Sequence, residues 1–443
     1  MTTTTDPEPT PVPATANPVG QALDPWWWTE PSVWKERLLT ALEQGIKGGV
    51  WYSLIDKVYR EGNLASAFAK VLANRGASGV DHVTVQEYDR QREANLRDLR
   101  ERLRDGTYRP QPIRRVYIPK PGSTEKRPLG IPTVRDRVVQ GALRHVLEPI
   151  FERDFATHSY GFRPGRGCKD ALRRVDTLLK AGYQYVVDVD LKSYFDTIPH
   201  DRLLGLVRQK VADGRILALV EGFLKAGILE DLREWTPVTG APQGAVLSPL
   251  LSNIYLNPLD HQLAEQGFEM VRYADDFVVL CRSEEEARRV LTVVQSWVAE
   301  AGLTLHPDKT RIVDAVAEGF DFLGYHFQHG RRWPRRKSLA RLKEKVRRKT
   351  ERTNGRSLEE IIGNLNATLR GWFVYFQHSV RSVFVRLDKW IRMRLRSILR
   401  KRQKRRGRGR GTDHKRWPNK FFAEQGLFNL EAAHASARQS STR

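Results

Sequence analysis

The chain is poor in cysteine and has no long apolar run. Only two cysteines, Cys168 and Cys281, occur among its 443 residues, which excludes a disulfide framework and a zinc site of the Cys-x-x-Cys type. It contains no run of about 18 apolar residues that would cross a membrane. Residues 1–24 are rich in Thr and Pro and lack the basic start and apolar stretch of a signal peptide, so we expect a disordered leader. Together these absences predict a cytoplasmic protein.

Acidic residues are scarce in one segment, and this scarcity gives the chain its net charge. The formal net charge is +23, and residues 331–410 alone contain 28 Lys or Arg against 5 Asp or Glu. The rest of the chain is therefore formally neutral. A neutral body joined to a strongly basic segment favours a polyanionic partner that is bound in a salt-sensitive way. Nucleic acid is the partner that the charge and the aromatic content favour, and an anionic membrane or a merely solvated charged face are the alternatives.

Short strand-like runs alternate with helical runs from residue 76 to about residue 330. The strand-like runs are RRVYIP, YQYVVDVDL, VRYADDFVVLC and FDFLGYHF, and two helices are expected near DRVVQGALRHVLEPIFERDF and SPLLSNIYLNPLDHQLAEQ. This alternation predicts an α+β domain with an antiparallel sheet covered on one face. Residues 25–75 precede it as a Trp-rich helical extension, whose tryptophans are more typical of packing than of base stacking.

From about residue 335 the pattern becomes helical and basic. Ser357-x-x-Glu360 is a capping box that opens a helix, and apolar residues at spacings of three and four give this helix one apolar face. A second helix follows in VRSVFVRLDKWIRMRLRSIL, and basic side chains that lie mostly off its apolar stripe are candidates for contact with an RNA backbone: Arg381, Arg386, Arg392 and Arg396. Beyond this helix, residues 404–443 are expected to form a flexible basic arm and a short tail with aromatic residues that dock.

The stretch MVRYADDFVVLC, residues 270–281, places Asp275 and Asp276 between two apolar runs. The pattern predicts a tight hairpin with both aspartates at its tip. Adjacent carboxylates repel each other by roughly 1–4 kcal/mol at contact distance, so their presence beside a core indicates a bound cation. Magnesium prefers carboxylates together with substrate phosphate oxygens, and a pair of such ions serves phosphoryl transfer.

This chemistry requires a further carboxylate on a neighbouring strand. The segment DVDLKSYFDTIPH, residues 188–200, supplies it in a strand of alternating Val and Asp. Alternation places Asp188 and Asp190 on the same face of the strand, so periodicity alone does not select between them.

Seven sequence blocks in a fixed order resemble the reverse transcriptases encoded by group II introns, over roughly residues 34–430. The blocks are RPLGIPTVRDRVVQ, SYGFRPGRG, DVDLKSYFDTIPH, APQGAVLSPLLSNIYL, RYADDFVV, GLTLHPDKT and FDFLGYHF. The helical segment around LNATLRGWFVYF is similar to the maturase-type thumb of that family. The resemblance implies a right-hand polymerase fold, with fingers and palm over residues 76–330 and a helical thumb or maturase domain over residues 331–403.

The resemblance also implies roles for the acidic residues. Asp190 and Asp275 match the metal ligands of such polymerases, Asp276 is the neighbouring carboxylate, and two Mg²⁺ ions are the expected cofactor. Phe195, five residues after Asp190, matches the aromatic gate that presses on a ribose 2′-hydroxyl and so favours deoxynucleotides. A plain core residue is the alternative at this position.

Further residues match the nucleotide-binding positions of the family. Gln243 matches the residue beside the incoming nucleotide and template, and Lys120 and Arg127 match the fingers residues that grip the triphosphate through charge-assisted bonds. Lys309 matches the lysine near the leaving pyrophosphate, with an ordinary surface lysine as the alternative.

The loop SYGFRPGRGCKDAL carries three basic residues just before a helix start: Arg163, Arg166 and Lys169. A helix start is a reasonable phosphate site, and in the family this loop meets template or intron RNA. A structural turn with solvated arginines is the alternative.

The function implied by the resemblance is that of an RNA-directed DNA polymerase and intron maturase. Its expected partners are a group II intron RNA, a target DNA with its primer, and deoxynucleoside triphosphates, and both a monomer and a homodimer stay open. The paired cysteines of the family's C-terminal nuclease are lacking, so we expect no endonuclease and a primer from elsewhere, such as a nascent strand at a replication fork. Two other functions stay open: a domesticated reverse transcriptase in defence, spacer acquisition or DNA repair, and a non-catalytic RNA-binding splicing cofactor.

Overall fold

The computed structural model describes residues 25–45, 49–119, 126–230, 233–405, 407 and 411–441. The expected leader and part of the expected basic arm therefore lie outside the described residues. The described residues form two compact units, one made of residues 25–171 and 187–312 and the other of residues 172–186 and 313–441. Within these ranges, no helix combines the length and the hydropathy that a bilayer crossing requires.

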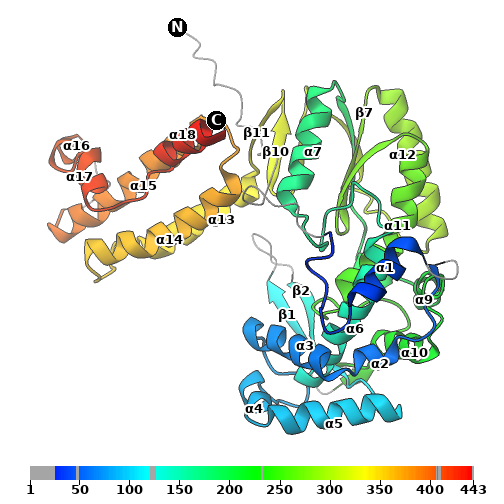
Figure 1. Ribbon diagram of the computed structural model, residues 1–443. Coiled ribbons are helices and arrows are strands. Elements are labelled where there is room, and N and C mark those ends of the chain that lie inside the picture. Colours follow the sequence, from blue (N-terminus) through cyan, green and yellow to red (C-terminus); the bar gives the residue numbers. More distant parts are fainter. Residues whose placement is uncertain are drawn as a thin grey trace. The chain divides into compact units, whose positions relative to one another are not determined.

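The larger unit contains helices and two sheets (Figure 1). Its helices are α1 (Glu36–Gln44), α2 (Ile55–Val58), α3 (Glu61–Asn74), α4 (Val85–Arg90), α5 (Arg92–Asp105), α6 (Val134–Glu152), α8 (Tyr194–Thr197), α9 (His200–Arg208), α10 (Gly214–Leu224), α11 (Ser248–Glu265) and α12 (Glu284–Glu300). Its strands are β1 (Ile113–Pro119), β2 (Lys126–Ile131), β4 (Ile228–Glu230), β5 (Arg233–Trp235), β6 (Glu269–Tyr273) and β7 (Asp276–Cys281). Three elements belong partly to each unit: α7 (Cys168–Lys180), β3 (Tyr185–Val189) and β8 (Arg311–Asp314).

The strand order shows why residues that are distant in sequence come together. One four-stranded sheet has the order β2-β1-β4-β5, with β1 antiparallel to β2 and parallel to β4. A second sheet has the order β6-β7-β3-β8, so the strand that ends at Val189 is the neighbour of the strand that begins at Asp276. Helix α11 packs against β6 and α12 against β7. The architecture is α+β, as the sequence predicts.

Helix α6 is the central helix of the larger unit, and it is buried on almost all sides although it carries polar residues such as Asp136 and Gln140. It begins after Thr133, whose hydroxyl accepts a hydrogen bond from the Asp136 amide at 3.1 Å, and nearly all of its residues are buried. Helix α3 packs along it. The indole nitrogen of Trp34 donates to the carbonyl of His145 on α6 at 2.8 Å, and the ring lies edge-on to Trp51. These two tryptophans therefore have the packing role that the sequence predicts.

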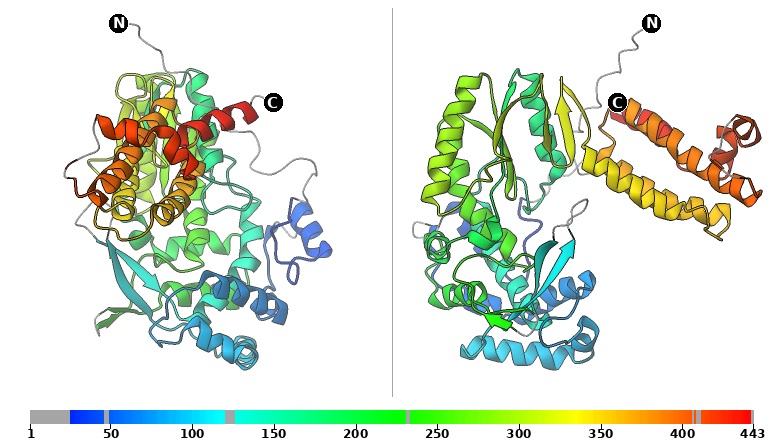
Figure 2. Two further views of the ribbon diagram at one scale, coloured as in Figure 1. Left: turned by 90° about the vertical axis from the view of Figure 1, so that its left-hand side faces the viewer. Right: turned by 180° about the vertical axis from the view of Figure 1, so that it is seen from behind.

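The other unit contains a small antiparallel sheet and a group of helices (Figure 2). The sheet has the order β11-β10-β9, formed by β9 (Phe320–Phe322), β10 (Tyr325–Gln328) and β11 (Arg331–Pro334). The helices are α13 (Arg336–Lys349), α14 (Leu358–Phe376), α15 (Arg381–Arg402), α16 (Thr412–Arg416), α17 (Asn419–Glu424) and α18 (Leu430–Ser441). Ser357 and Glu360 form the predicted capping box at the start of α14.

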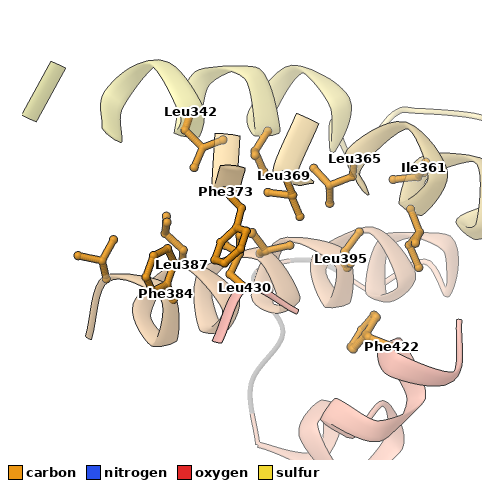
Figure 3. Packing of buried hydrophobic residues seen from close by; sticks show 14 of the residues in the cluster. Leu342, Ile361, Leu365, Leu369, Phe373, Phe384, Leu387, Leu395, Phe422 and Leu430 are labelled. Carbon is orange, nitrogen blue, oxygen red and sulfur yellow. The ribbon is translucent and has the colours of Figure 1, made fainter. Parts of the chain in front are cut away.

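A single apolar cluster holds these helices together (Figure 3). It combines residues of α13, α14 and α15 with Phe422 of α17 and Leu430 of α18. The carboxylate of Asp388 on α15 accepts hydrogen bonds from the amides of Leu430 and Glu431 at 3.2 and 2.9 Å, which fixes the start of α18. The segment after the basic arm thus docks on the helices before it, as predicted from its aromatic residues.

Candidate active site

The hairpin predicted around the two aspartates is present. Strands β6 and β7 are antiparallel with Tyr273 opposite Asp276, and Ala274 and Asp275 form the turn between them. Ala274 has a φ of +60°, the left-handed conformation that this tight turn requires. The remaining residues of both strands are mostly buried and apolar, so the turn is anchored directly in the core.

Asp190 follows β3, the strand next to β7 in the sheet, and its backbone is tied to the segment that follows α12. The amide of His306 donates to the Asp190 carbonyl at 2.8 Å. The ammonium of Lys309 lies 3.1 Å from one carboxylate oxygen of Asp190 and 3.3 Å from the other. Asp190 and Lys309, for which the sequence predicts separate roles, therefore form one ion pair.

The carboxylates of Asp190 and Asp275 interact electrostatically. Burial raises the pKa of Asp275, the negative charge of Asp190 raises it further, and the positive charge of Arg272 lowers it. Asp276 is exposed at the start of β7. A cation bound beside Asp275 would offset the burial and the neighbouring negative charge that disfavour its ionised form.

The donor set fits a hard divalent ion that also binds substrate. Among the described residues, no group of three or more His, Cys, Asp or Glu is close enough to form a metal site by itself. Mg²⁺ typically takes only one or two protein carboxylates and completes its coordination with water and substrate phosphates. The pair formed by Asp190 and Asp275 has the donor chemistry that such a site requires.

Phe195 and Gln243 line the same cavity, which has a volume of about 420 Å³. The Phe195 carbonyl accepts a hydrogen bond from the Ala241 amide at 2.7 Å. A Cβ on Gly240 would lie 2.9 Å from the same carbonyl oxygen, so this close approach of the two segments requires glycine. Arg115 of β1 also lines the cavity, with its guanidinium 5.0 Å from the Trp235 ring centre. Sequence reasoning missed Arg115, although two adjacent arginines, Arg114 and Arg115, begin the strand-like pattern RRVYIP.

The turn that carries Gln243 is joined to β2 through its backbone. The Gly130 amide donates to the Gln243 carbonyl at 2.7 Å, and a Cβ on Gly244, whose φ is +102°, would lie 2.6 Å from the Gly130 carbonyl oxygen. Helix α11 starts five residues after Gln243, at Ser248, whose hydroxyl donates to the Pro242 carbonyl at 2.9 Å. The helix and β2 thus hold the turn from both ends.

Of the two predicted triphosphate ligands, the structure describes only Arg127. Arg127 is exposed on β2, opposite Ile118 of β1. Lys120 lies outside the described residues. Their proposed contact with a triphosphate stays a prediction.

The structure corrects one prediction for the loop before α7. The guanidinium of Arg163 is 2% exposed and forms a fork with the carboxylate of Glu152, with Nη2 2.7 Å from Oε1, while Nη1 donates to the carbonyls of Ala156 and Ser159. A side chain this deeply buried holds the loop together and is not free to bind RNA, because its charge is already paired inside the protein.

The other two basic residues of this loop are more accessible. Arg166 donates to the Thr157 carbonyl and lies over the Tyr160 ring at 5.9 Å, and Lys169 is half-buried in the first turn of α7. RNA contact by these two side chains stays a prediction.

The predicted RNA-contacting arginines of α15 differ in their surroundings, and one prediction is wrong. Arg396 is 3% exposed and donates to the Trp417 carbonyl and the Asn419 side chain, both at 2.9 Å. It is a structural residue that joins α15 to the segment around α17. Arg386 is exposed, Arg392 is half-buried, and Arg381 is paired with Glu431.

The unit that contains α13 to α18 also carries a groove of about 600 Å³ with basic side chains in its lining. Helices α13 and α14 contribute most of its lining, which includes three cationic side chains and no acidic one among its described residues: Arg335, Arg341 and Lys345. Gly371 of α14 also lines the groove, and a Cβ there would meet nothing within 4 Å. Sequence reasoning did not single out these residues because they belong to a run in which almost every second residue is basic.

Comparison with known proteins identifies the class of this arrangement. A family model described as reverse transcriptase (RNA-dependent DNA polymerase) matches residues 118–327, and one described as the maturase-specific domain of group II introns matches residues 339–417. Protein YkfC of Escherichia coli (strain K12) is 35% identical over 344 residues, which cover 68% of this chain and 86% of YkfC. The group II intron-encoded protein LtrA of Lactococcus lactis subsp. cremoris is 42% identical over 196 residues, which cover 44% of this chain and 32% of LtrA.

Two further comparisons are more distant or more partial. An uncharacterized 91 kDa protein in the cob intron of Schizosaccharomyces pombe is 33% identical over 279 residues, which cover 50% of this chain and 34% of that protein. A chain of a partial Cas6-RT-Cas1–Cas2 complex matches with a TM-score of 0.36 and 23% identity, covering 56% of this chain and 41% of that chain. The structural likeness is too low to add to the argument.

The chain thus contains the RNA-dependent DNA polymerase domain of reverse transcriptases. Because this domain is followed by a maturase-specific domain and both have intron-encoded relatives, the chain belongs to the group II intron-type reverse transcriptases and maturases. Its class of function is that of an RNA-directed DNA polymerase joined to an intron maturase, in a family whose polymerase domain generally uses divalent metal ions and whose substrates are nucleic acids. The chain spans about a third of the length of the two intron-encoded relatives.

Proposed function

We propose that the chain binds a group II intron RNA, assists its splicing and copies it into DNA, with polymerisation at Asp190 and Asp275. The observation that carries the catalytic part is that Asp190 directly follows β3 and Asp275 directly precedes the neighbouring strand β7, where burial first and then the charge of Asp190 raise the pKa of Asp275. A cluster of negative charge beside a core is unfavourable by itself. A cation that takes part in the reaction would offset this charge, which explains why the carboxylates are present.

In this proposal Asp190 and Asp275 hold two Mg²⁺ ions, with Asp276 as the neighbouring carboxylate. When bound, such ions stabilise the attacking and leaving oxygens of an in-line phosphoryl transfer. Lys309 pairs with Asp190 at 3.1 Å, so it would hold the carboxylate in place and offer a positive charge to the leaving phosphates. The protein otherwise contributes position and charge, which carry most of the catalysis in this reaction class.

The nucleotide would occupy the cavity lined by Phe195, Gln243 and Arg115. The Phe195 ring would then exclude a ribose 2′-hydroxyl. The neighbouring Tyr194, whose hydroxyl donates to the Ser252 carbonyl at 2.9 Å, supports this role because it fixes α8 to α11. Arg127 and Lys120 are proposed triphosphate ligands, and Arg115 on β1, the strand that pairs with the strand of Arg127, adds a further cation.

Nucleic acid would be bound by the helical unit. Within the proposed thumb or maturase domain, residues 331–403, the groove with Arg335, Arg341 and Lys345 has the positive charge that attracts a sugar-phosphate backbone. The exposed Arg386 and the half-buried Arg392 add two further cationic side chains on α15. The proposed fingers and palm cover residues 76–330, the helical extension residues 25–75, and the basic arm and tail residues 404–443.

The test of polymerisation is extension of a DNA primer on an RNA template with deoxynucleotides and Mg²⁺. Wild type is expected to extend the primer, and Asp275→Asn is expected to lose extension while it keeps its affinity for RNA. Asp98→Asn, which alters a half-buried carboxylate on α5 that is paired with Arg102 and Arg135, is the matched control and should extend like wild type. Equal extension by all three proteins would refute the assignment of the site.

A second assay separates the intron role from a domesticated polymerase. Addition of the protein to a group II intron RNA transcript at low Mg²⁺ should accelerate splicing, and Asp275→Asn should accelerate it equally because RNA folding needs no nucleotide transfer. Polymerase activity without any effect on splicing would favour the domesticated alternative.

A further inference from the structure

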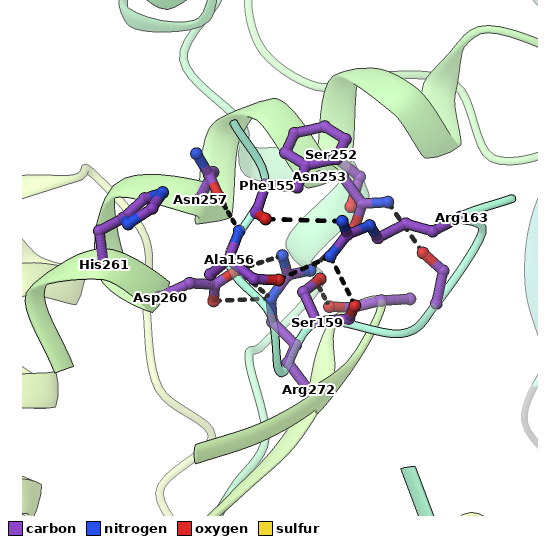
Figure 4. Close-up of polar contacts among 12 residues, drawn as sticks. Phe155, Ala156, Ser159, Arg163, Ser252, Asn253, Asn257, Asp260, His261 and Arg272 are labelled. Atoms are coloured by element: carbon purple, nitrogen blue, oxygen red, sulfur yellow. Dashed lines mark hydrogen bonds and ion pairs between the residues drawn. The ribbon is translucent and has the colours of Figure 1, made fainter. Parts of the chain in front are cut away.

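Arg272 on β6 is fully buried two residues before the turn that carries Asp275, and Figure 4 shows its polar contacts with α11. The guanidinium of Arg272 donates from Nε to both carboxylate oxygens of Asp260 at 2.8 and 3.0 Å, and Nη2 also contacts this carboxylate. Its Nη1 donates to the side-chain oxygen of Asn253 at 2.9 Å and to the backbone carbonyl of Ala274 at 2.8 Å. One side chain thus joins two residues of α11 to the turn between β6 and β7.

Stability alone does not account for this pair. Both side chains are completely inaccessible, and a buried ion pair loses so much hydration that an apolar replacement of similar volume often leaves stability unchanged or improved. What arginine offers beyond an apolar residue is a rigid planar fork that binds several acceptors in fixed directions. Here the fork satisfies a carboxylate, an amide and a carbonyl at once.

The turn itself is held in a conformation that it would not adopt freely. Ala274 has a φ of +60°, which costs energy for any residue with a Cβ and persists only when its surroundings fix it. Gly161 packs against the turn so closely that a Cβ there would lie 2.3 Å from the Ala274 nitrogen. Asn253 donates to the Gly161 carbonyl at 2.8 Å, so α11 fixes both the residue behind the turn and the arginine that binds the turn.

We propose that Arg272 is a positioning residue which, held by Asp260 and Asn253, fixes the Ala274 carbonyl and thereby orients the Asp275 carboxylate for binding a divalent cation. The physical link is the peptide bond between Ala274 and Asp275. Because that bond is planar, a carbonyl fixed on one side fixes the direction of the Asp275 nitrogen and Cα on the other. The inference rests on the proposed role of Asp275 as a metal ligand.

The chain offers a matched control. Arg332 is 1% exposed, pairs with Asp176 and donates to the His378 carbonyl at 3.0 Å, and all three residues belong to the other unit. Arg332→Lys therefore removes a buried fork of the same chemistry without touching the hairpin. Any effect common to this variant and Arg272→Lys reflects stability alone.

The experiment compares wild type, Arg272→Lys and Arg332→Lys by three readouts. The first is the melting temperature, the second is Mn²⁺ binding by electron paramagnetic resonance without nucleotide, and the third is the Mg²⁺ concentration that gives half-maximal single-nucleotide incorporation. Mn²⁺ suits the same oxygen ligands as Mg²⁺. Both variants are expected to melt at a lower temperature, while only Arg272→Lys is expected to weaken Mn²⁺ binding and to raise the half-saturating Mg²⁺ concentration by about tenfold or more, since misplacement by 1 Å costs up to about 100-fold in comparable sites.

A gentler variant keeps the test decisive if Arg272→Lys does not fold. Asn253→Ala removes one acceptor of Arg272 and the donor to Gly161, and it should shift the metal dependence in the same direction by a smaller factor. If the variants at 272 and 253 bind Mn²⁺ like Arg332→Lys, the positioning role is overturned. If they bind Mn²⁺ more weakly but wild type itself incorporates no nucleotide, the positioning role stands and the proposed polymerase function fails.

Discussion

The carboxylate of Asp275 is held in a place that disfavours its charge. Burial and then the neighbouring Asp190 raise its pKa above the ordinary value. Raising the pKa of a carboxyl in the folded state means that the protonated form is the one that the fold favours. This contribution to stability is fully present at low pH and is lost as the pH rises through the raised pKa.

The first prediction follows from the direction in which the pKa of Asp275 is shifted. In metal-free buffer, Asp275→Asn should melt at a higher temperature than wild type near neutral pH, because the substitution removes an unfavourable buried charge. The difference should shrink as the pH falls below the raised pKa, where the wild-type carboxyl is protonated too. Thermal melts in a chelator over a pH series measure both effects. A variant that melts below wild type at neutral pH would contradict the account of this carboxylate.

The second prediction concerns the ring of Phe195. Phe195→Val should increase incorporation of ribonucleotides relative to deoxynucleotides by about tenfold, the range expected when a few methylene-sized groups leave a pocket. The ratio of kcat/KM for a ribonucleotide and the matching deoxynucleotide on one RNA template measures it. An unchanged ratio with an intact fold would show that Phe195 is only a packing residue.

Single buried arginines mark the limit of sequence reasoning. Arg272 and Arg396 look like ordinary basic residues on their elements, yet both are buried by partners that are distant or unpatterned in sequence. Arg396 is covered by the segment around Trp417. The helical periodicity of α15 does not predict that contact. For Arg272 a signal existed, because an arginine inside the apolar run MVRYADDFVVLC demands a buried acceptor.

At the level of elements, the local signals were sufficient where the interactions are local. The hairpin of β6 and β7, the capping box before α14 and the start of α15 depend on neighbours within a few residues, and the sequence predicts each of them. The strand order β6-β7-β3-β8 and the joining of the Gln243 turn to β2 depend on contacts between segments that are distant in the sequence. Family resemblance implied their proximity, but no periodicity did.

The third prediction separates two arginines of α15. Arg396→Ala should reduce the free energy of unfolding by about 1–3 kcal/mol, because it leaves the Trp417 carbonyl and other buried polar groups without their donor. Arg386→Ala, at an exposed position of the same helix, should leave stability unchanged within error. Denaturant titration measures the difference, and equal stability of the two variants would contradict the structural role of Arg396.

In RNA binding we expect the opposite order, with a larger effect for the substitution of Arg386 than for that of Arg396. If Arg386 contacts a phosphate, its removal should weaken binding to any RNA and reduce the slope of log affinity against log salt by about 1. Salt titrations of RNA binding test this, and an unchanged slope would exclude Arg386 from the interface.

At the level of the whole molecule, the charge and the chemistry belong to different parts of the chain. The net charge of +23 is carried by residues 331–410, whereas the proposed catalytic carboxylates and the nucleotide cavity belong to the formally neutral remainder. Composition alone indicates this division, but the site within the basic segment required the structure, which gathers Arg335, Arg341 and Lys345 around one groove. Catalysis and RNA affinity should therefore be separable by substitution.

The most direct test of this division measures primer extension and RNA affinity side by side for wild type, Asp275→Asn and the double variant Arg341→Ala/Lys345→Ala. The account predicts that Asp275→Asn binds the RNA like wild type and extends nothing. It predicts that the double variant binds RNA more weakly, with a salt slope reduced by about 2, and regains extension at saturating template. Extension by Asp275→Asn, or unchanged RNA affinity in the double variant, would contradict it.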